Sequence, residues 1–331
     1  MEERLYLGWF TLQWHITHRC NLRCSHCYQR DFDAFCSRDA MLETLEKFRV
    51  FLDNRQLRGH LNVTGGEPLM HPDLFFLLEA AREREISAAV LTNGTLIDGR
   101  TARRLSRAGV TYVQVSLDGT KAVHDAIRGS GSFDRAVAGI ETALRCGIDV
   151  TVSFTAQNGN IGDFEALARF CRKLGVGKLW FDRVVIPAAE DINGLSLSAA
   201  DYQTLCGIAS KRRYRDTVAC IRALQFIPCK QRHIYACTAG KRQLALLADG
   251  TVLPCRRLPL PAGNVLFSDF ETICRESPLL QALSDAGIPD ACSGCRWAQT
   301  CRGGAKCIAY AKTGRWDVRD PDCPVPADAG R

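Results

Sequence analysis

Residues 12–28 of the chain read LQWHITHRCNLRCSHCY, and this stretch decides the fold. Its first part, LQWHIT, alternates apolar and polar side chains, as a strand with one buried face does. The loop that follows places the thiols of Cys20, Cys24 and Cys27 close together. Three thiolates on one short loop can ligate a [4Fe–4S] cluster and leave one iron open to a further ligand. A zinc ion, with His18 or His26 as its fourth ligand, is the alternative interpretation.

Short apolar segments and amphipathic segments alternate along the first half of the chain. We expect strands at 12–17, 60–64, 88–92, 112–116, 149–155 and 178–183, and helices at 39–53, 72–84, 98–108, 132–146, 163–174 and 198–211. This rhythm is typical of an α/β fold with a parallel sheet, here a partial (β/α)6 TIM-like barrel. The region after residue 220 is rich in Cys, Gly and Pro and predicts an irregular C-terminal domain. We place the boundary near residue 215, which gives domains over 1–215 and 216–331.

Polar groups follow the end of every expected strand. After the Cys loop come Gly65-Gly66-Glu67-Pro68, Thr92-Asn93-Gly94, Ser116-Leu117-Asp118-Gly119, Ser153 with Thr155, and Asp182-Arg183. Because the chemistry of α/β barrels gathers at the carboxyl ends of the strands, we expect these groups to share one cavity. Asp182, His124 and Tyr28 are candidates for moving protons there.

The CxxxCxxC triplet, followed by Tyr28 and closing the first strand of an α/β barrel, resembles the signature of the radical S-adenosylmethionine (SAM) superfamily. The resemblance implies an enzyme in which the open iron chelates the amino and carboxylate groups of SAM. An electron from the cluster then cleaves SAM to methionine and a 5′-deoxyadenosyl radical, which abstracts hydrogen from the substrate. Cys20, Cys24 and Cys27 would ligate this catalytic cluster.

The same resemblance assigns further residues to SAM. Gly65, Gly66 and Glu67 match the motif at the methionyl end of SAM, where Glu67 would accept a hydrogen bond from the ammonium group. Positions that match the family elsewhere around SAM are Tyr28, Asn93, Ser116, Asp118 and Arg128. Arg128 is expected to pair either with the SAM carboxylate or in a structural salt bridge.

A second set of cysteines follows a different spacing. Cys237 and Cys255 flank Gly250, and later come Cys292-x2-Cys295-x5-Cys301, Gly303-Gly304 and Cys323. This pattern resembles the SPASM domain, a C-terminal extension of radical SAM enzymes that carries one or two auxiliary iron–sulfur clusters. The resemblance implies that one auxiliary cluster is ligated by Cys292, Cys295, Cys301 and Cys323. A zinc ribbon built from Cys292, Cys295, Cys301 and Cys307 is the alternative.

The second auxiliary cluster is less well defined by the sequence. The resemblance assigns it Cys237 and Cys255, with Cys229 as a third ligand. The family's next cysteine is replaced by Ala305, and the nearest thiol is Cys307. Either Cys307 reaches this cluster, or the cluster keeps an open iron, is a [2Fe–2S] cluster or is absent.

Most enzymes with this pair of domains modify peptides, so the resemblance implies a maturase that cross-links or oxidises a ribosomally made peptide or protein. A reductant such as flavodoxin or ferredoxin is an expected partner. About eleven residues precede the first strand, so we expect recognition by a separate leader-recognition protein or by the barrel and SPASM surface. The alternatives are modification of a tetrapyrrole or other small molecule, whose enzymes CRGGAKCIAYAKTGRWDVRDPDC also resembles, sulfatase-type maturation, and a non-catalytic iron–sulfur protein.

Composition sets the remaining expectations. The 17 cysteines and the absence of a secretory signal favour metal or cluster binding in the cytoplasm over a disulfide framework. No apolar run reaches the length that crosses a bilayer, which predicts no membrane partner. The net charge of +7 comes without aromatic residues among the basic clusters, so it does not indicate nucleic-acid binding.

Overall fold

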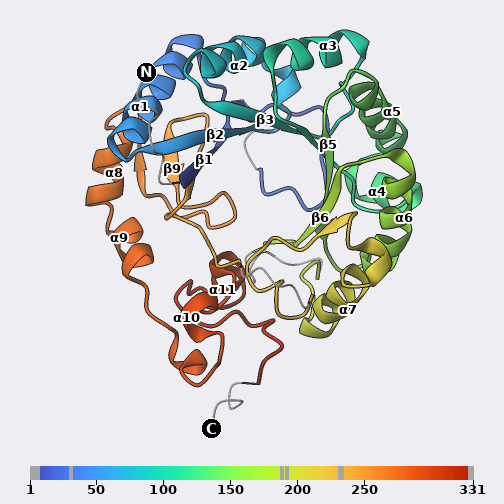
Figure 1. Cartoon of the computed structure of the whole chain (residues 1–331), viewed down its shortest axis with the longest axis vertical. Coiled ribbons are helices and arrows are strands. Elements are labelled where there is room, and N and C mark those ends of the chain that lie inside the picture. Colours follow the sequence, from blue (N-terminus) through green and yellow to red (C-terminus); the bar gives the residue numbers. More distant parts are fainter. Residues whose placement is uncertain (1–7, 30–32, 187–189, 191–193, 230–234, 327–331) are drawn as a thin grey trace.

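The computed structural model describes residues 8–29, 33–186, 190, 194–229 and 235–326. Six parallel strands follow one another in sequence order and curve around a central space (Figure 1). They are β1 (Gly8–His15), β2 (Leu57–Thr64), β3 (Ser87–Thr92), β4 (Val113–Ser116), β5 (Val150–Ala156) and β6 (Lys178–Arg183). The predicted α/β fold with a partial barrel is confirmed.

Helices cover the outer face of the sheet (Figure 1). The expected ones are α1 (Arg38–Asn54), α2 (Leu74–Glu83), α3 (Gly99–Ala108), α5 (Ser132–Arg145), α6 (Phe164–Leu174) and α7 (Ala199–Ala209). The side chains of Ser37, Asp98 and Ser198 cap α1, α3 and α7 by accepting hydrogen bonds from backbone N–H groups of the first turn. A further helix, α4 (Lys121–Arg128), was not predicted from the sequence.

The strands present apolar side chains outward and polar side chains inward. Leu61 and Val63 of β2, for example, are fully buried in the core, whereas Asn62 and Thr64 between them line an internal cavity. The same alternation occurs in β1, β4, β5 and β6, because successive side chains of a strand point to opposite faces. The core therefore lies between the sheet and its helices, and the inside of the barrel remains open.

The C-terminal region continues the barrel sheet at both edges. The short strand β7 (Val218–Ala219) pairs with β6, and β8 (Gln243–Leu246) pairs in parallel with β1, Thr11 opposite Gln243 and Trp14 opposite Leu246. Two antiparallel strands follow, β9 (Thr251–Leu253) and β10 (Gly263–Asn264). The region also contains α8 (Phe270–Glu276), α9 (Pro278–Asp285), α10 (Ala298–Cys301) and α11 (Lys306–Thr313). One sheet thus runs through the proposed boundary near residue 215, which stays a prediction.

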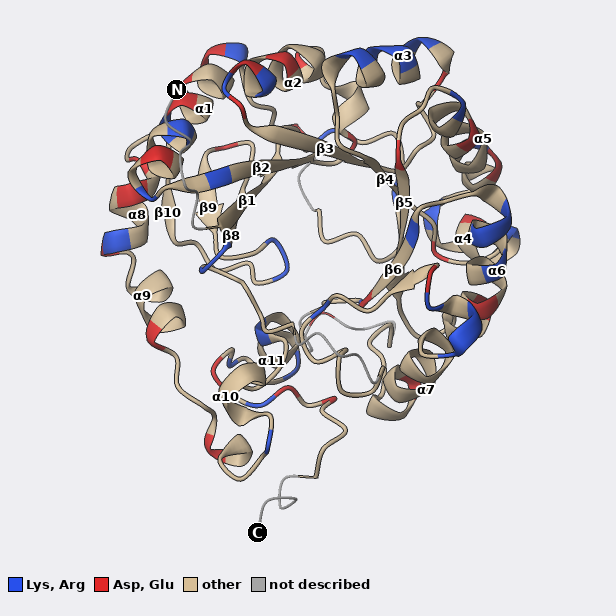
Figure 2. Ribbon diagram, in the orientation of Figure 1, with Lys and Arg blue, Asp and Glu red and all other residues tan. Residues whose placement is uncertain are grey.

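Charged residues of both signs are spread over the outer helices (Figure 2). The helices within the described part of the chain include none that is long and apolar enough to cross a membrane. The C-terminal helices α9, α10 and α11 lie in the opening of the curved sheet, on the side opposite β3 (Figure 1). They close the ring around the central space.

Candidate active site

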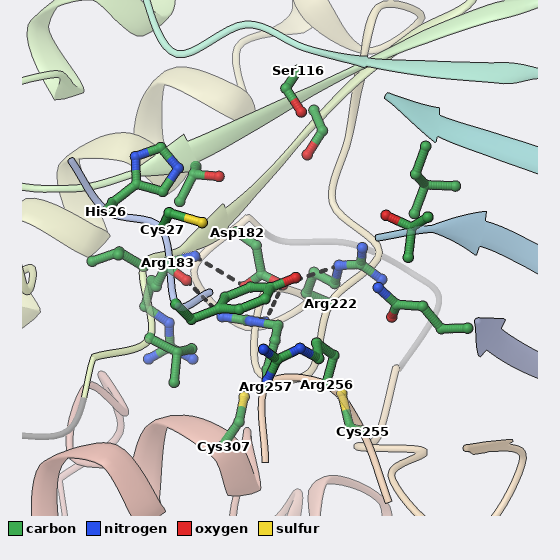
Figure 3. A pocket seen from close by; sticks show the side chains of 18 of the residues that line it. His26, Cys27, Ser116, Asp182, Arg183, Arg222, Cys255, Arg256, Arg257 and Cys307 are labelled. Atoms are coloured by element: carbon green, nitrogen blue, oxygen red, sulfur yellow. Dashed lines mark hydrogen bonds and ion pairs between the residues drawn. The ribbon is translucent and has the colours of Figure 1, made fainter. Parts of the chain in front are cut away.

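A cavity of about 740 Å³ lies at the carboxyl ends of the parallel strands. One wall carries the three thiols of the Cys loop, Cys20, Cys24 and Cys27, and another carries three thiols from the C-terminal region, Cys237, Cys255 and Cys307. Figure 3 shows Cys27, Cys255 and Cys307 around this space. The predicted site residues Tyr28, Gly65, Gly66, Asn93, Ser116 and Arg128 also line it. The strand ends therefore do share one cavity.

The Cys loop surrounds its sulfur atoms with nitrogen donors. The backbone N–H groups of Leu22 and Gln29 each lie 3.4 Å from a sulfur, those of Cys20 and Cys27 respectively. Two side chains from other strand ends add to them: Asn93 Nδ2 lies 4.0 Å from the Cys20 sulfur and Arg128 Nη1 lies 3.8 Å from the Cys24 sulfur. Donors of this kind suit thiolate sulfur, which accepts hydrogen bonds when it ligates iron.

Gly65 and Gly66 bring the end of β2 against the start of the Cys loop. Gly66 N–H donates to the Thr17 carbonyl at 2.7 Å, and Glu67 N–H donates to the Arg19 carbonyl at 2.8 Å. A Cβ atom on Gly65 would lie 2.3 Å from the Thr17 carbonyl oxygen, and one on Gly66 would lie 2.3 Å from that of Arg19. The glycines therefore permit a close approach of two backbones that positions the thiols.

Glu67 lies behind the cavity wall. Its side chain is fully buried, and its carboxylate accepts hydrogen bonds from Leu69 N–H (3.1 Å), Thr92 Oγ1 (2.7 Å) and Asn93 N–H (2.8 Å). Burial raises the pKa of Glu67, and these donors oppose that shift. The described contacts fasten the end of β2 to the end of β3. Its contact with the SAM ammonium group stays a prediction.

Asp118 and Arg128 form a buried ion pair. Arg128 Nε lies 2.5 Å from Asp118 Oδ2, and Asp118 Oδ1 accepts a hydrogen bond from Thr155 N–H at 2.8 Å. Burial by itself would raise the pKa of Asp118, but Arg128 and His26 outweigh it and the pKa is lowered. Of the two partners predicted for Arg128, the described structure contains the structural salt bridge. Asp118 stands behind Arg128 and is not part of the cavity wall.

Two histidines beside this ion pair are neutral at ordinary pH. Burial is the largest cause that lowers the pKa of His26 and of His124, in each case to about 4. His124 Nδ1 accepts a hydrogen bond from Asp118 N–H at 3.2 Å, a contact that requires the unprotonated nitrogen.

The C-terminal cysteines fall into three groups. Cys292 interacts electrostatically with Cys295 and Cys323, and Cys301 interacts with Cys292 and Cys323, so the four residues predicted for one auxiliary cluster lie near one another. Cys307, in the first turn of α11, interacts instead with Cys255 and Cys237. Burial raises the pKa of the Cys307 thiol to about 12.

Cys229 belongs to the third group. It forms hydrogen bonds with Cys206 and Cys220, and all three side chains are buried away from the cavity wall. The structure therefore corrects the sequence prediction that Cys229 joins Cys237 and Cys255. Residues 230–234 and the fold of the chain separate Cys229 from that pair, and Cys307 occupies the expected third place.

Comparison with known proteins agrees with this arrangement. Residues 14–171 match the radical SAM superfamily, and residues 237–296 match the iron–sulfur cluster-binding SPASM domain. The chain is a radical SAM enzyme. Its cofactors are SAM and [4Fe–4S] clusters, and the non-catalytic alternative is set aside.

Relatives of this radical SAM enzyme carry more than one name. It is 29% identical to the mycofactocin maturase MftC of Mycobacterium ulcerans, over 94% of this chain and 87% of the relative. It is 26% identical to the AdoMet-dependent heme synthase of Methanosarcina barkeri, over 94% of this chain and 95% of the relative. Its fold is similar to that of native anSMEcpe with bound AdoMet and Cp18Cys peptide, with a TM-score of 0.79 and 21% identity over 95% of this chain and 93% of that one.

The residues of the radical SAM enzyme fit these cofactors. The Cys loop presents three thiols with nitrogen donors near each sulfur, and the cavity in front of it is open. Among the described residues, no three His, Cys, Asp or Glu side chains are drawn together as the ligands of a single metal ion are. The ligand assignments themselves stay predictions.

Sequence reasoning missed part of the cavity wall. Arg222, Arg256 and Arg257 all line it, and Arg256 stacks on the predicted SAM-site residue Tyr28 with 3.9 Å between the guanidinium carbon and the ring centre. A signal was present for two of them, because Arg256 and Arg257 directly follow the predicted ligand Cys255. Asp182, which the sequence did place in the cavity, contacts both Arg222 and Arg257.

Proposed function

We propose that this radical SAM enzyme cross-links or oxidises a ribosomally made peptide or protein. The observation that carries the proposal is the single cavity with a set of three thiols on each of two walls. When bound, the Cys-loop cluster and SAM supply a radical that removes hydrogen from the substrate. A substrate segment in this cavity also lies against Cys237, Cys255 and Cys307, where a second electron acceptor serves a two-electron oxidation.

The proposal gives the chain's own residues distinct tasks. Cys20, Cys24 and Cys27 hold the catalytic cluster, and Asn93 and Arg128 direct nitrogen donors at its thiolates. Tyr28, Ser116 and the Gly65-Gly66 backbone form the wall against which SAM lies. Glu67 and Asp118 hold that wall in place from behind.

Relatives support a peptide as substrate. The mycofactocin maturase aligns over nearly the whole chain, and the anSMEcpe structure holds a peptide together with AdoMet. A separate leader-recognition protein and a reductant such as flavodoxin or ferredoxin complete the proposed system. Sulfatase-type maturation is a special case of the same chemistry.

The test is anaerobic reconstitution followed by a substrate screen. Iron and sulfide are counted, 5′-deoxyadenosine is assayed after reduction, and candidate peptides are searched by mass spectrometry for the loss of two hydrogens. Cys24→Ala should abolish both 5′-deoxyadenosine and the mass change, whereas Cys146→Ala, a half-buried cysteine outside the site, should retain them. Cleavage of SAM by a Cys20/Cys24/Cys27 triple alanine variant would contradict the assignment of the catalytic cluster.

A second candidate function is modification of a tetrapyrrole or another carboxylated small molecule. The arginines in the cavity favour it, because guanidinium groups bind carboxylates. The heme synthase that aligns over 94% of this chain supports it as well. Conversion of coproporphyrin III, with no change in any peptide, would replace the first proposal by this one.

A further inference from the structure

Three arginines form a cationic cluster in the cavity wall. Arg222, Arg256 and Arg257, hereafter the arginine cluster, line the cavity together with Asp182 of β6. Figure 3 shows Arg257 between Asp182 and the thiols of Cys255 and Cys307. The cluster brings together segments from either side of β8, so it exists only in the folded molecule.

The arginine cluster carries more positive charge than its neighbours neutralise. Arg222 Nε lies 3.1 Å from Asp182 Oδ2, and Arg257 contacts the same oxygen, so one carboxylate serves two guanidinium groups. Arg256 forms no ion pair within the described residues, and its Nε is buried without a hydrogen-bond partner. Glu190, the other acidic residue in the cavity wall, is exposed. The cluster therefore has a surplus of two positive charges.

The other arginines of the cavity differ in this respect. Arg128 is paired with Asp118, and Arg183 is paired with both Asp320 and Asp322 at 2.8 Å. Each of them thus has at least one carboxylate of its own. Since partly buried guanidinium groups are costly without a counter-ion, the surplus in the arginine cluster requires an explanation.

The cysteines explain only part of that surplus. Arg257 interacts electrostatically with Cys255 and Cys307, so it can offset the negative charge of thiolates there. Arg222 is near Cys255 as well but stacks on Trp180, 3.9 Å from its ring centre. Arg256 stacks on Tyr28, next to Cys27 of the Cys loop. Arg222 and Arg256 therefore have nitrogen donors to spare beside the place where hydrogen is removed.

Resting on the proposed function, we propose that Arg222 and Arg256 bind a carboxylate group of the substrate and so determine which part of it enters the cavity. The planar guanidinium group offers paired N–H donors that match the two oxygens of a carboxylate. In a peptide the carboxylate is that of Asp, Glu or the C-terminus, and in a tetrapyrrole it is a propionate. The recognised chemistry is the same in both.

The experiment compares acidic probes with neutral counterparts on the SAM-loaded holoenzyme under anaerobic conditions. Calorimetry with pentaglutamate and pentaglutamine, and fluorescence with coproporphyrin III and its tetramethyl ester, give the four affinities. We expect the wild type to bind at least one acidic probe about tenfold or more tightly than its neutral partner, as charge-assisted hydrogen bonds imply. Arg222→Gln and Arg256→Gln should each reduce that preference about tenfold, and the double variant should remove it.

Controls separate recognition from folding and from cluster loading. Arg145→Gln, on the exposed face of α5, should behave as the wild type, and Arg256→Lys should keep part of the preference. Iron content and the electron paramagnetic resonance spectrum of the reduced enzyme are recorded for every variant. Arg256→Gln should leave that spectrum unchanged, since Arg256 has no described contact with a cysteine.

The outcomes are distinct. Absence of any preference for acidic probes in the wild type, including failure of all four to bind, would overturn the inference without the use of a variant. So would a double variant that binds the acidic probe as the wild type does. A preference for coproporphyrin III alone would keep the carboxylate site and contradict the peptide substrate. A peptide that is modified equally by the wild type and by the double variant would contradict the carboxylate site alone.

Discussion

At the scale of single residues, the exchange of Ala305 for a cysteine two positions later has a direct consequence. Cys307 faces the cavity with Cys237 and Cys255, whereas Cys229 bonds with Cys206 and Cys220. We expect Cys307→Ala to lower the iron content and to alter the spectrum of the auxiliary clusters. Cys229→Ala should keep the iron and lower only the melting temperature, because it removes a buried thiol from the core.

The reverse result, iron lost from Cys229→Ala and retained in Cys307→Ala, would restore the ligand set suggested by sequence spacing. Spacing alone could not decide between them. It does not report which thiols the intervening loops bring together, and both cysteines lie near Cys237 and Cys255 in the pattern.

His124 makes stability depend on pH. Its native contact requires neutral Nδ1, and its pKa falls from 6.5 to about 4 on folding, which corresponds to about 3 kcal/mol. Because the folded pKa is depressed, this contribution is fully present above pH 6.5 and is lost as the pH falls toward 4. His26 acts in the same direction.

We therefore expect the melting temperature to decline between pH 6.5 and 4, and His124→Asn to flatten that decline. The measurement is thermal unfolding across this range at constant ionic strength. An unchanged slope in the variant would show that other groups cause the decline.

At the scale of elements, the contact between the end of β2 and the Cys loop is the most demanding. A methyl group at Gly66 would lie 2.3 Å from the Arg19 carbonyl oxygen, where only backbone could move. Gly66→Ala should therefore displace the loop and reduce both iron loading and 5′-deoxyadenosine formation several-fold. Gly207→Ala on α7 is the matched control, since a Cβ there meets open space, and it should stabilise the helix by about 0.5–1 kcal/mol.

The sequence predicts the regular elements well where periodicity is long. All six barrel strands follow from alternating apolar and polar residues, because one face of each packs on helices and the other lines a polar cavity. Helix α4 escapes prediction because eight residues give barely two turns of pattern. Strand β8 escapes it because four residues become a strand only through pairing with distant β1.

At the scale of the whole molecule, one buried ion-pair group joins the barrel to the C-terminal segment. Arg183 of β6 contacts Asp320 and Asp322 at 2.8 Å, and all three side chains are almost fully buried. We expect Arg183→Gln to cost about 3–5 kcal/mol, because it leaves two carboxylates buried without their partner. Hydrogen exchange should then increase around residues 303–323, which carry Cys323.

The surface pair of Arg169 with Glu165 provides the control. Its atoms are 3.9 Å apart and Arg169 is 54% exposed, so Arg169→Gln should change stability by less than about 1 kcal/mol. Equal exchange in Arg183→Gln and wild type would contradict the anchoring role of Arg183.

The parts of the site that sequence could not predict are those assembled across the whole chain. Cys20, Cys24 and Cys27 lie on one loop, and their neighbours at the strand ends follow from the barrel rule. The arginine cluster combines Arg222 with Arg256 and Arg257, which no local pattern joins. Its surplus charge becomes visible only when the distances to Asp182 and the stacking on Tyr28 are known.

The pairing of β1 with β8 also determines the order of assembly during synthesis. Thr11 is among the first residues to leave the ribosome, yet its partner Gln243 is made when most of the chain has already emerged. Until then one edge of β1 has no partner strand, and the thiols that follow it lie at an unfinished rim. Maturation factors that deliver iron and sulfide thus have a period of access to these thiols that ends when the C-terminal region folds over the ring.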